Sequence, residues 1–215
     1  VMLLSCAAFA EEVKPVILVV SFGTSYNDNR DLSIGAVEEA IQAAYPDWEV
    51  RRAFTAQTVI DILDERDAID TDNVTEAMDK LVADGVKKVV IQPTHVMNGA
   101  EYDDVMAEIA PYADQFEGFA VGAPLLTSVE DYEVVTEALL AENEYAGSED
   151  TAIVYMGHGT HHFANATYSQ AQLVMQAAGY ENAFVGTVEG FPALENVMAN
   201  VTAYGATKVV LYPFM

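Results

Sequence analysis

Three kinds of residue are scarce in this 215-residue chain: cysteine, lysine and arginine. Cys6 is the only cysteine, which excludes a disulfide within the chain and a cysteine-ligated zinc site. Nine Lys and Arg stand against 34 Asp and Glu, and the formal net charge is −25 at pH 7. Because a field of this sign repels nucleic acid and anionic membranes and attracts cations, we exclude nucleic acid as a partner.

Several nucleotide-binding and hydrolase motifs are also missing. The chain has no G-x-x-x-x-G-K-[ST] phosphate loop and no G-x-G-x-x-G that opens a helix. It has neither the H-E-x-x-H pair of metalloproteases nor the G-x-S-x-G turn of serine hydrolases. Activities built on these motifs, ATP hydrolysis among them, are therefore not expected.

The amino-terminal segment 1–10 is apolar and ends in Ala8-Phe9-Ala10, a small-residue cleavage pattern. We expect it to be part of a signal peptide, with the mature protein beginning near Glu11 and exported, for example to the periplasm. Cys6 after Leu-Leu-Ser also resembles a lipid-attachment site, which would give a lipid-anchored protein. A native extension of the mature protein is the remaining alternative. No other apolar run approaches the roughly 20 residues that span a bilayer.

The whole chain is 52% hydrophobic and 20% charged, and after residue 10 short apolar runs alternate with helical patterns. This alternation predicts an α/β fold with parallel sheets and helices on both faces. The strands are predicted at Val16–Ser21, Glu49–Phe54, Lys88–Pro93, 118–123, 151–157, 183–189 and Lys208–Pro213. The helices are predicted around 32–41, 59–63, 74–82, 101–112, 130–140, 168–178 and 193–204.

The two halves of the chain resemble each other. Segment 83–93 matches 203–213, and segment 17–24 matches 153–160. Two copies of one α/β unit around a cleft are therefore expected, with His158 in the place that Phe22 holds in the first copy.

The repeat also predicts where the domains divide. We place an N-terminal domain at 11–125 and a C-terminal domain at 126–215. The first copy continues past Pro93 into another helix and strand, whereas the sequence stops two residues after Pro213. The C-terminal domain is therefore expected to be incomplete at its carboxyl end.

Histidine and carboxylate residues follow several of the predicted strands. His158 stands between two glycines at the end of the 151–157 run, and His95, Glu101 and Glu189 lie at or just past the ends of other predicted strands. In open α/β sheets ligands bind at the carboxyl ends of strands. Imidazole with carboxylate suits cobalt, nickel, iron or zinc, and it also suits proton abstraction near neutral pH. His161 and His162 are expected to be ordinary polar residues of the loop.

Five motifs follow one another along the chain: Val-Ser-Phe-Gly-Thr-Ser (20–25), Ile-Gln-Pro-Thr-His-Val-Met-Asn-Gly-Ala-Glu-Tyr (91–102), Gly-Ala-Pro-Leu-Leu (122–126), Met-Gly-His-Gly (156–159) and Val-Gly-Thr-Val-Glu (185–189). This ordered series resembles the sirohydrochlorin cobaltochelatases, class II chelatases related to protoporphyrin ferrochelatase. The resemblance implies two similar α/β domains around a tetrapyrrole cleft, and ATP-independent insertion of a divalent metal.

Matching these motifs residue by residue implies roles for the candidate site. His158 would be a metal ligand and the acceptor of pyrrole protons, Glu189 a second metal ligand, and Glu101 an aid to proton removal or metal delivery. A further metal-binding histidine of the family falls beyond Met215. The resemblance implies Co²⁺ as the metal, with Ni²⁺ or Fe²⁺ as alternatives. Some exported members of the family bind haem between subunits through a histidine, and the motif leaves two roles open for His95, such a haem ligand or a residue of the cleft; a homo-oligomer is also expected.

Two other classes of protein remain alternatives. An exported metal- or tetrapyrrole-binding protein would retain its ligand without turnover, and a periplasmic solute-binding protein also has two α/β lobes.

A chelatase with this net charge would need local cations for the carboxylates of sirohydrochlorin. Arg51 and Arg52, near the second strand, are the only adjacent arginines.

Overall fold

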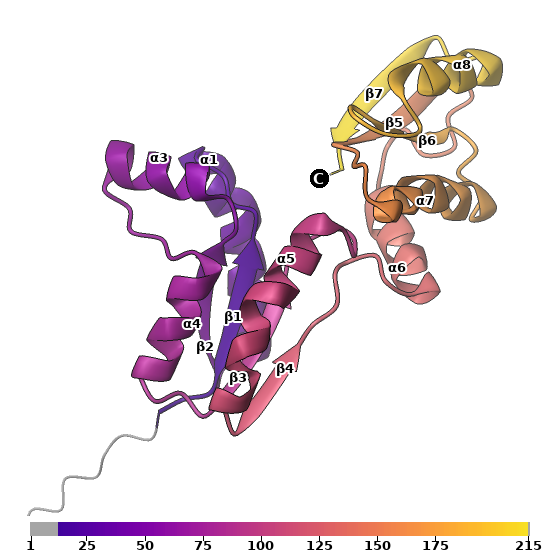
Figure 1. Cartoon of the computed structure of the whole chain (residues 1–215). Coiled ribbons are helices and arrows are strands. Elements are labelled where there is room, and N and C mark those ends of the chain that lie inside the picture. Colours follow the sequence, from indigo (N-terminus) through magenta and orange to yellow (C-terminus); the bar gives the residue numbers. More distant parts are fainter. Residues whose placement is uncertain (1–12, 215) are drawn as a thin grey trace, which may run out of the picture. The chain divides into compact units, whose positions relative to one another are not determined.

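The computed structural model describes residues 13–214, which pack as two compact α/β units (Figure 1). The first unit comprises the chain up to Pro93 together with Ala107–Gly122. The second comprises Thr94–Met106 and the chain from Ala123 onward. The predicted domain limits, 11–125 and 126–215, stay predictions. The predicted signal segment 1–10, with Cys6, lies outside the described residues, as does Met215. No helix of the described part is both long and apolar enough to span a bilayer.

The first unit is built on a parallel sheet in the order β2-β1-β3-β4. Its strands are β1 (Val16–Ser21), β2 (Glu49–Phe54), β3 (Lys88–Pro93) and β4 (Gly118–Val121). All six residues of β1 are buried, and an unbroken apolar run of this kind is typical of a strand that is covered on both faces. The predicted parallel α/β fold is confirmed for this unit.

The helices of this unit are α1 (Asn27–Arg30), α2 (Ala36–Ala44), α3 (Gln57–Asp67) and α4 (Val74–Ala83), whereas α5 (Ala100–Ile109) is divided between the two units after Met106. A π-helical turn, Asp31–Gly35, joins α1 to α2. The helix predicted at 101–112 ends early, at Ile109, and a 3-10 segment follows. Pro111 explains this end, because proline lacks the N–H of an α-helical bond and its ring clashes with the preceding turn.

The second unit has a parallel sheet in the order β6-β5-β7. Its strands are β5 (Thr151–Gly157), β6 (Ala183–Thr187) and β7 (Lys208–Pro213), and its helices are α6 (Val129–Leu140), α7 (Ala166–Ala177) and α8 (Leu194–Tyr204). Side chains alternate across a strand, so Ile153 and Tyr155 pack with α6 and α7, while Ala152 and Val154 pack with α8. The sheet is thereby covered on both faces (Figure 1).

The registers of the two sheets confirm the internal repeat. β1 lies between β2 and β3 as β5 lies between β6 and β7. Val20 pairs with Pro93 in one sheet, and Met156 pairs with Pro213 in the other. Phe22 and His158 therefore follow equivalent strand ends, as the sequence predicted.

Candidate functional site

His158 follows the last residue of β5, at the carboxyl edge of the second sheet, and it is exposed. Its Nδ1 lies 3.0 Å from the carbonyl oxygen of Gly159. Because a carbonyl oxygen only accepts, this contact assigns the proton to Nδ1 and leaves the lone pair on Nε2. Nε2 is the atom that can bind a metal ion or accept a proton.

The two glycines around His158 are required by close packing. The ring of Tyr168 lies against Gly157, where any Cβ would overlap it. Gly159 has a φ of +87°, and a Cβ there would lie 2.6 Å from the backbone nitrogen of Gly190. The Tyr168 hydroxyl accepts the Gly159 N–H at 3.3 Å. The buried side chain of Tyr168 therefore supports the Gly-His-Gly turn.

Glu189 is joined to His158 through the backbone. The Val188 N–H donates to the Gly157 carbonyl at 3.1 Å, and the Glu189 N–H donates to the His158 carbonyl at 2.8 Å. The strand predicted at 183–189 stops at Thr187, and residues 188 and 189 leave the sheet in a tight loop. Both candidate metal ligands thus lie on exposed loops at one edge of the sheet.

Asn165 lies beside both of these loops and was not singled out from the sequence. Its Oδ1 accepts the Thr160 N–H at 3.1 Å, and its Nδ2 donates to the Phe191 carbonyl at 2.7 Å. An asparagine in a polar loop carries no pattern that separates it from its neighbours. Only the three-dimensional contacts reveal it.

His95 and Glu101 lie close together in the second unit. His95 Nε2 is 3.8 Å from Glu101 Oε2, which is too far for a hydrogen bond. The His95 side chain is 8% exposed, and neither ring nitrogen has a hydrogen-bond partner. Burial lowers the pKa of His95, so the ring is neutral at pH 7 and the contact is not an ion pair there. Both ring nitrogens are buried, so neither is open to a haem iron in this arrangement. Haem binding through His95 stays a prediction.

Glu101 is in the first turn of α5, and its side chain is 56% exposed. Partial burial raises the pKa of its carboxyl group, and the nearby His158 opposes that rise. A carboxyl with a raised pKa accepts a proton more readily than an ordinary surface glutamate does. The electrostatic interaction with His158 places Glu101 in the same neighbourhood as the candidate ligand.

His162 connects the loop after β5 to the start of α5. Its Nδ1 accepts the Ala164 N–H at 3.2 Å, and its Nε2 lies 3.4 Å from Asp103 Oδ2. The ring therefore caps the short 3-10 turn Phe163–Asn165 and faces a carboxylate. His162 therefore makes two specific contacts, whereas the sequence predicted an ordinary polar residue of the loop.

The described residues do not contain a group of three or more His, Cys, Asp or Glu placed to hold a metal ion together. His158, Glu189 and Glu101 as metal or proton ligands therefore stay predictions.

Exposed apolar side chains lie on or next to the two loops. Phe163 is 82% exposed, Val188 is 72% exposed and Phe191 is 60% exposed, although all three are hydrophobic. They follow β5 or β6, at the same edge of the sheet as His158. Large apolar groups exposed beside a polar centre are typical of a surface that binds a partly apolar ligand.

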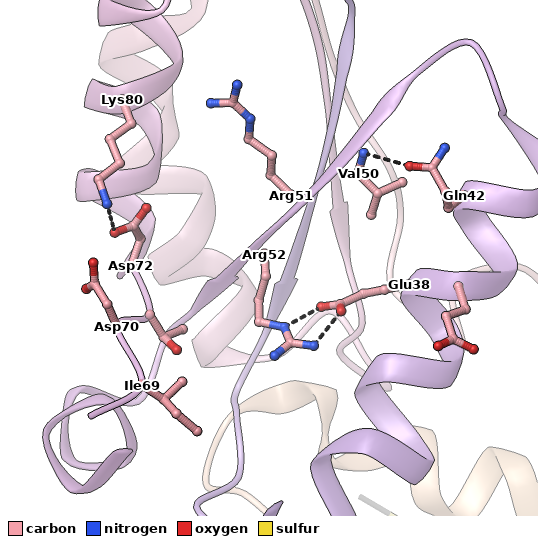
Figure 2. Close-up of a pocket in the computed structure, with 11 residues that line it drawn as sticks. Glu38, Gln42, Val50, Arg51, Arg52, Ile69, Asp70, Asp72 and Lys80 are labelled. Atoms are coloured by element: carbon pink, nitrogen blue, oxygen red, sulfur yellow. Dashed lines mark hydrogen bonds and ion pairs between the residues drawn. The ribbon is translucent and has the colours of Figure 1, made fainter. Parts of the chain in front are cut away.

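A separate hollow of about 460 Å³ lies in the first unit, between α2, β2 and the segment before α4 (Figure 2). Arg51 and Arg52 line it, and both lie within β2. Arg52 donates two hydrogen bonds to Glu38, at 2.7 and 2.5 Å. Arg51 donates to Asp84 at 2.6 Å and to Glu49 at 2.8 Å. Since both guanidinium groups are already paired, they are not free to bind the carboxylates of a substrate.

Comparison with known proteins places this chain in a family. The family model described as cobalt chelatase (CbiK) matches residues 15–215. The chain belongs to the CbiK cobalt chelatase family. A sirohydrochlorin cobaltochelatase of Salmonella typhimurium is 37% identical over 203 residues, which cover 94% of this chain and 76% of the relative. Sirohydrochlorin cobaltochelatase CbiKC of Nitratidesulfovibrio vulgaris is 30% identical over 207 residues, covering 94% of this chain and 71% of that protein.

Membership of the CbiK family confirms the resemblance drawn from the ordered motifs. The matched range includes both sheets and every candidate site residue, namely His95, Glu101, His158 and Glu189. The family assignment therefore rests on the whole described fold and not on the Gly-His-Gly turn alone.

Proposed function

We propose that this protein inserts a divalent metal ion, Co²⁺ in the first place, into sirohydrochlorin without ATP. The observation that carries the proposal is the exposed His158, whose Nε2 lone pair is free while Glu189 is tied to the same turn by the 2.8 Å backbone bond. Two relatives that share most of the chain bear the name sirohydrochlorin cobaltochelatase.

The reaction exchanges two pyrrole protons of the macrocycle for one divalent ion. His158 Nε2 can hold the ion before transfer, and after the ion leaves it can accept a pyrrole proton. Glu189 reduces the cost of removing water from the ion because its carboxylate offsets positive charge. Glu101, with a raised pKa and a partly exposed carboxyl, can accept a proton and release it to solvent.

The apolar side chains near the site suit the flat faces of a tetrapyrrole. A chain with a net charge of −25 repels the carboxylates of sirohydrochlorin at long range. Arg51 and Arg52 do not offset this repulsion, because both are paired with acidic residues. Contact with Phe163 and Phe191, which are exposed beside the site, therefore contributes binding free energy that charge does not supply.

Replacing His158 with alanine tests the proposal. We expect His158→Ala to lower cobalt insertion by at least about 100-fold, because it removes the group that binds the metal and accepts the proton. Thermal stability should change little, since the side chain is exposed. The assay follows macrocycle absorbance against time at saturating cobalt, with exposed His161→Ala as the matched control.

Near wild-type turnover in His158→Ala would overturn the site assignment. The same assay separates an enzyme from a binding protein. A binding protein without turnover would take up one equivalent of metal or tetrapyrrole and then stop, whereas a chelatase continues until substrate is consumed.

The choice of metal and the state of assembly are further parts of the proposal. Ni²⁺ and Fe²⁺ are alternative substrates, because imidazole and carboxylate bind these ions as they bind Co²⁺. Comparing the three ions in the insertion assay ranks them. We also propose a homo-oligomer, which light scattering of the purified protein tests. Haem binding through His95 stays a prediction.

We propose that the protein is exported, on the strength of the apolar segment 1–10 and its Ala8-Phe9-Ala10 ending. The mature amino terminus is then expected near Glu11, and the protein in the periplasm. Mass spectrometry of protein isolated from its native host measures this terminus. A mature chain that still carries residues 1–10 would end the proposal of a cleaved signal.

A further inference from the structure

We propose that Asn165 is a positioning residue that holds the loop carrying Glu189 against the loop carrying His158. The proposal deepens the proposed function, on which it rests for its catalytic meaning. Asn165 does not contact the reacting atoms; it acts through the two loops that carry the candidate ligands.

The amide of Asn165 contacts one loop with each of its polar atoms. Oδ1 accepts the Thr160 N–H at 3.1 Å, two residues after His158. Nδ2 donates to the Phe191 carbonyl at 2.7 Å, two residues after Glu189. One planar side chain therefore fixes the spacing between two segments that come from different strands.

The backbone next to Asn165 leaves room for its side chain. A Cβ at Gly190 would overlap Asn165 Oδ1, so only glycine leaves room for this approach. The Gly190 N–H donates to the Thr187 hydroxyl at 3.1 Å, and that hydroxyl donates to the Pro192 carbonyl at 3.1 Å. The Glu189 loop is thus closed on itself at Thr187 and joined to the His158 loop by Asn165.

The contact requires both a donor and an acceptor, which only an amide of this length provides. An aspartate keeps the acceptor for Thr160, but it loses the donor and brings a carboxylate against the Phe191 carbonyl. If local charge alone mattered, this extra negative charge would strengthen metal binding. If geometry matters, the same change weakens metal binding, so Asn165→Asp gives opposite outcomes for the two explanations.

Asn182 offers a matched control in the same unit. It is fully buried and immediately precedes β6, at the amino end of the sheet rather than the carboxyl end. Its side chain also joins separate backbone segments, since Oδ1 accepts the Gly147 N–H at 3.0 Å and Nδ2 donates to the carbonyls of Tyr145 and Thr151 at 2.8 Å. Asn182→Asp therefore removes the same kind of contact at a place remote from His158.

The experiment compares wild type, Asn165→Asp, Asn165→Ala and Asn182→Asp in the full chain. The first measurement is hydrogen exchange at the amides of Val188 and Glu189, which bond to the carbonyls of Gly157 and His158. The second is the dissociation constant for Co²⁺ alone, from a spectroscopic titration without tetrapyrrole. The third is kcat and KM for cobalt insertion, and melting temperatures are recorded for every variant.

We expect both Asn165 variants to exchange the two amides about tenfold faster than wild type, because a supporting hydrogen bond is lost. Their dissociation constant for Co²⁺ should rise about tenfold, the usual effect of removing a group that orients a ligand. Asn182→Asp should lower the melting temperature at least as much, but leave exchange at 188 and 189 and cobalt affinity unchanged.

Two results would overturn the inference. One is unchanged exchange at Val188 and Glu189 in Asn165→Asp, and the other is cobalt binding in that variant as tight as in wild type. Failure of the proposed function gives a different result, in which the exchange pattern follows expectation but wild type inserts no metal. The exchange measurement needs no activity and therefore decides the positioning role in either case.

Discussion

At the scale of single residues, His95 shows how burial determines what a side chain can do. Its position after a strand and its chemistry suggested a ligand, and the sequence contains nothing that reports its exposure. In the structure its side chain is 8% exposed, and both ring nitrogens lack partners. A neutral ring with two unsatisfied buried nitrogens is a cost to stability.

This cost leads to a prediction for His95→Leu. The substitution removes both unsatisfied nitrogens and should raise the free energy of unfolding by about 1 kcal/mol at pH 8. The folded-state pKa of His95 is lowered by burial, so below about pH 6.5 the unfolded chain binds a proton that the folded chain does not. Wild type therefore loses stability as the pH falls, and the advantage of His95→Leu should be larger at pH 5.5 than at pH 8.

Urea denaturation at the two pH values measures this difference. Exposed His161→Leu is the control, because its side chain lies in solvent in the folded chain. A His95→Leu protein that is less stable than wild type at both pH values would show that His95 makes a stabilising interaction through its nitrogens.

At the scale of helices and strands, most bounds follow from local pattern. β1, β2, β3 and β7 have the limits predicted from the sequence, because apolar or alternating runs between turn residues define a strand locally. β6 is shorter than predicted, because the bonds between Thr187 and residues Gly190 and Pro192 turn the chain out of the sheet. Those bonds depend on a loop conformation that periodicity does not describe.

The turn after β5 gives a prediction at this scale. Gly157→Ala should lower the free energy of unfolding by about 2 kcal/mol, because the new methyl group overlaps the ring of Tyr168 in the packed core. Thermal or urea denaturation measures the change. Gly35→Ala is the control, since its Cβ would have only the Arg30 carbonyl nearby, at 3.6 Å, and alanine favours a helix over glycine.

Equal stability of Gly157→Ala and wild type would mean that Tyr168 moves aside without cost. The first glycine of Gly-His-Gly would then have no packing role. A loss confined to Gly157→Ala, with Gly35→Ala as stable as wild type or more so, would support the close approach of the tyrosine.

At the scale of the whole molecule, two similar units carry different chemistry. The Ala56 N–H donates to the Phe22 carbonyl at 3.2 Å, just as the Glu189 N–H donates to the His158 carbonyl at 2.8 Å. The backbone framework is therefore present in both units, but its two equivalent positions hold Phe and Ala in one and His and Glu in the other. Within the described residues, the repeat supplies the scaffold and two substitutions supply the candidate ligands.

The net charge is also a property of the whole molecule. With 34 acidic residues against nine basic ones, most carboxylates have no cation to pair with. The surface attracts divalent ions and disfavours polyanions, which is consistent with a metal as one substrate. Composition alone was sufficient for this conclusion because long-range fields depend on total charge more than on fold.

The sequence by itself determined the class of fold, the internal repeat, the family and the strand end that His158 follows. These follow from local periodicity and from ordered motifs, which need no knowledge of distant contacts. Only the tertiary structure decided that His95 is buried and unpaired, that Arg51 and Arg52 are neutralised, and that Asn165 joins two loops. The physical reason is that burial, ion pairing and hydrogen bonding between loops depend on which distant segments pack together, and a linear pattern does not contain that information.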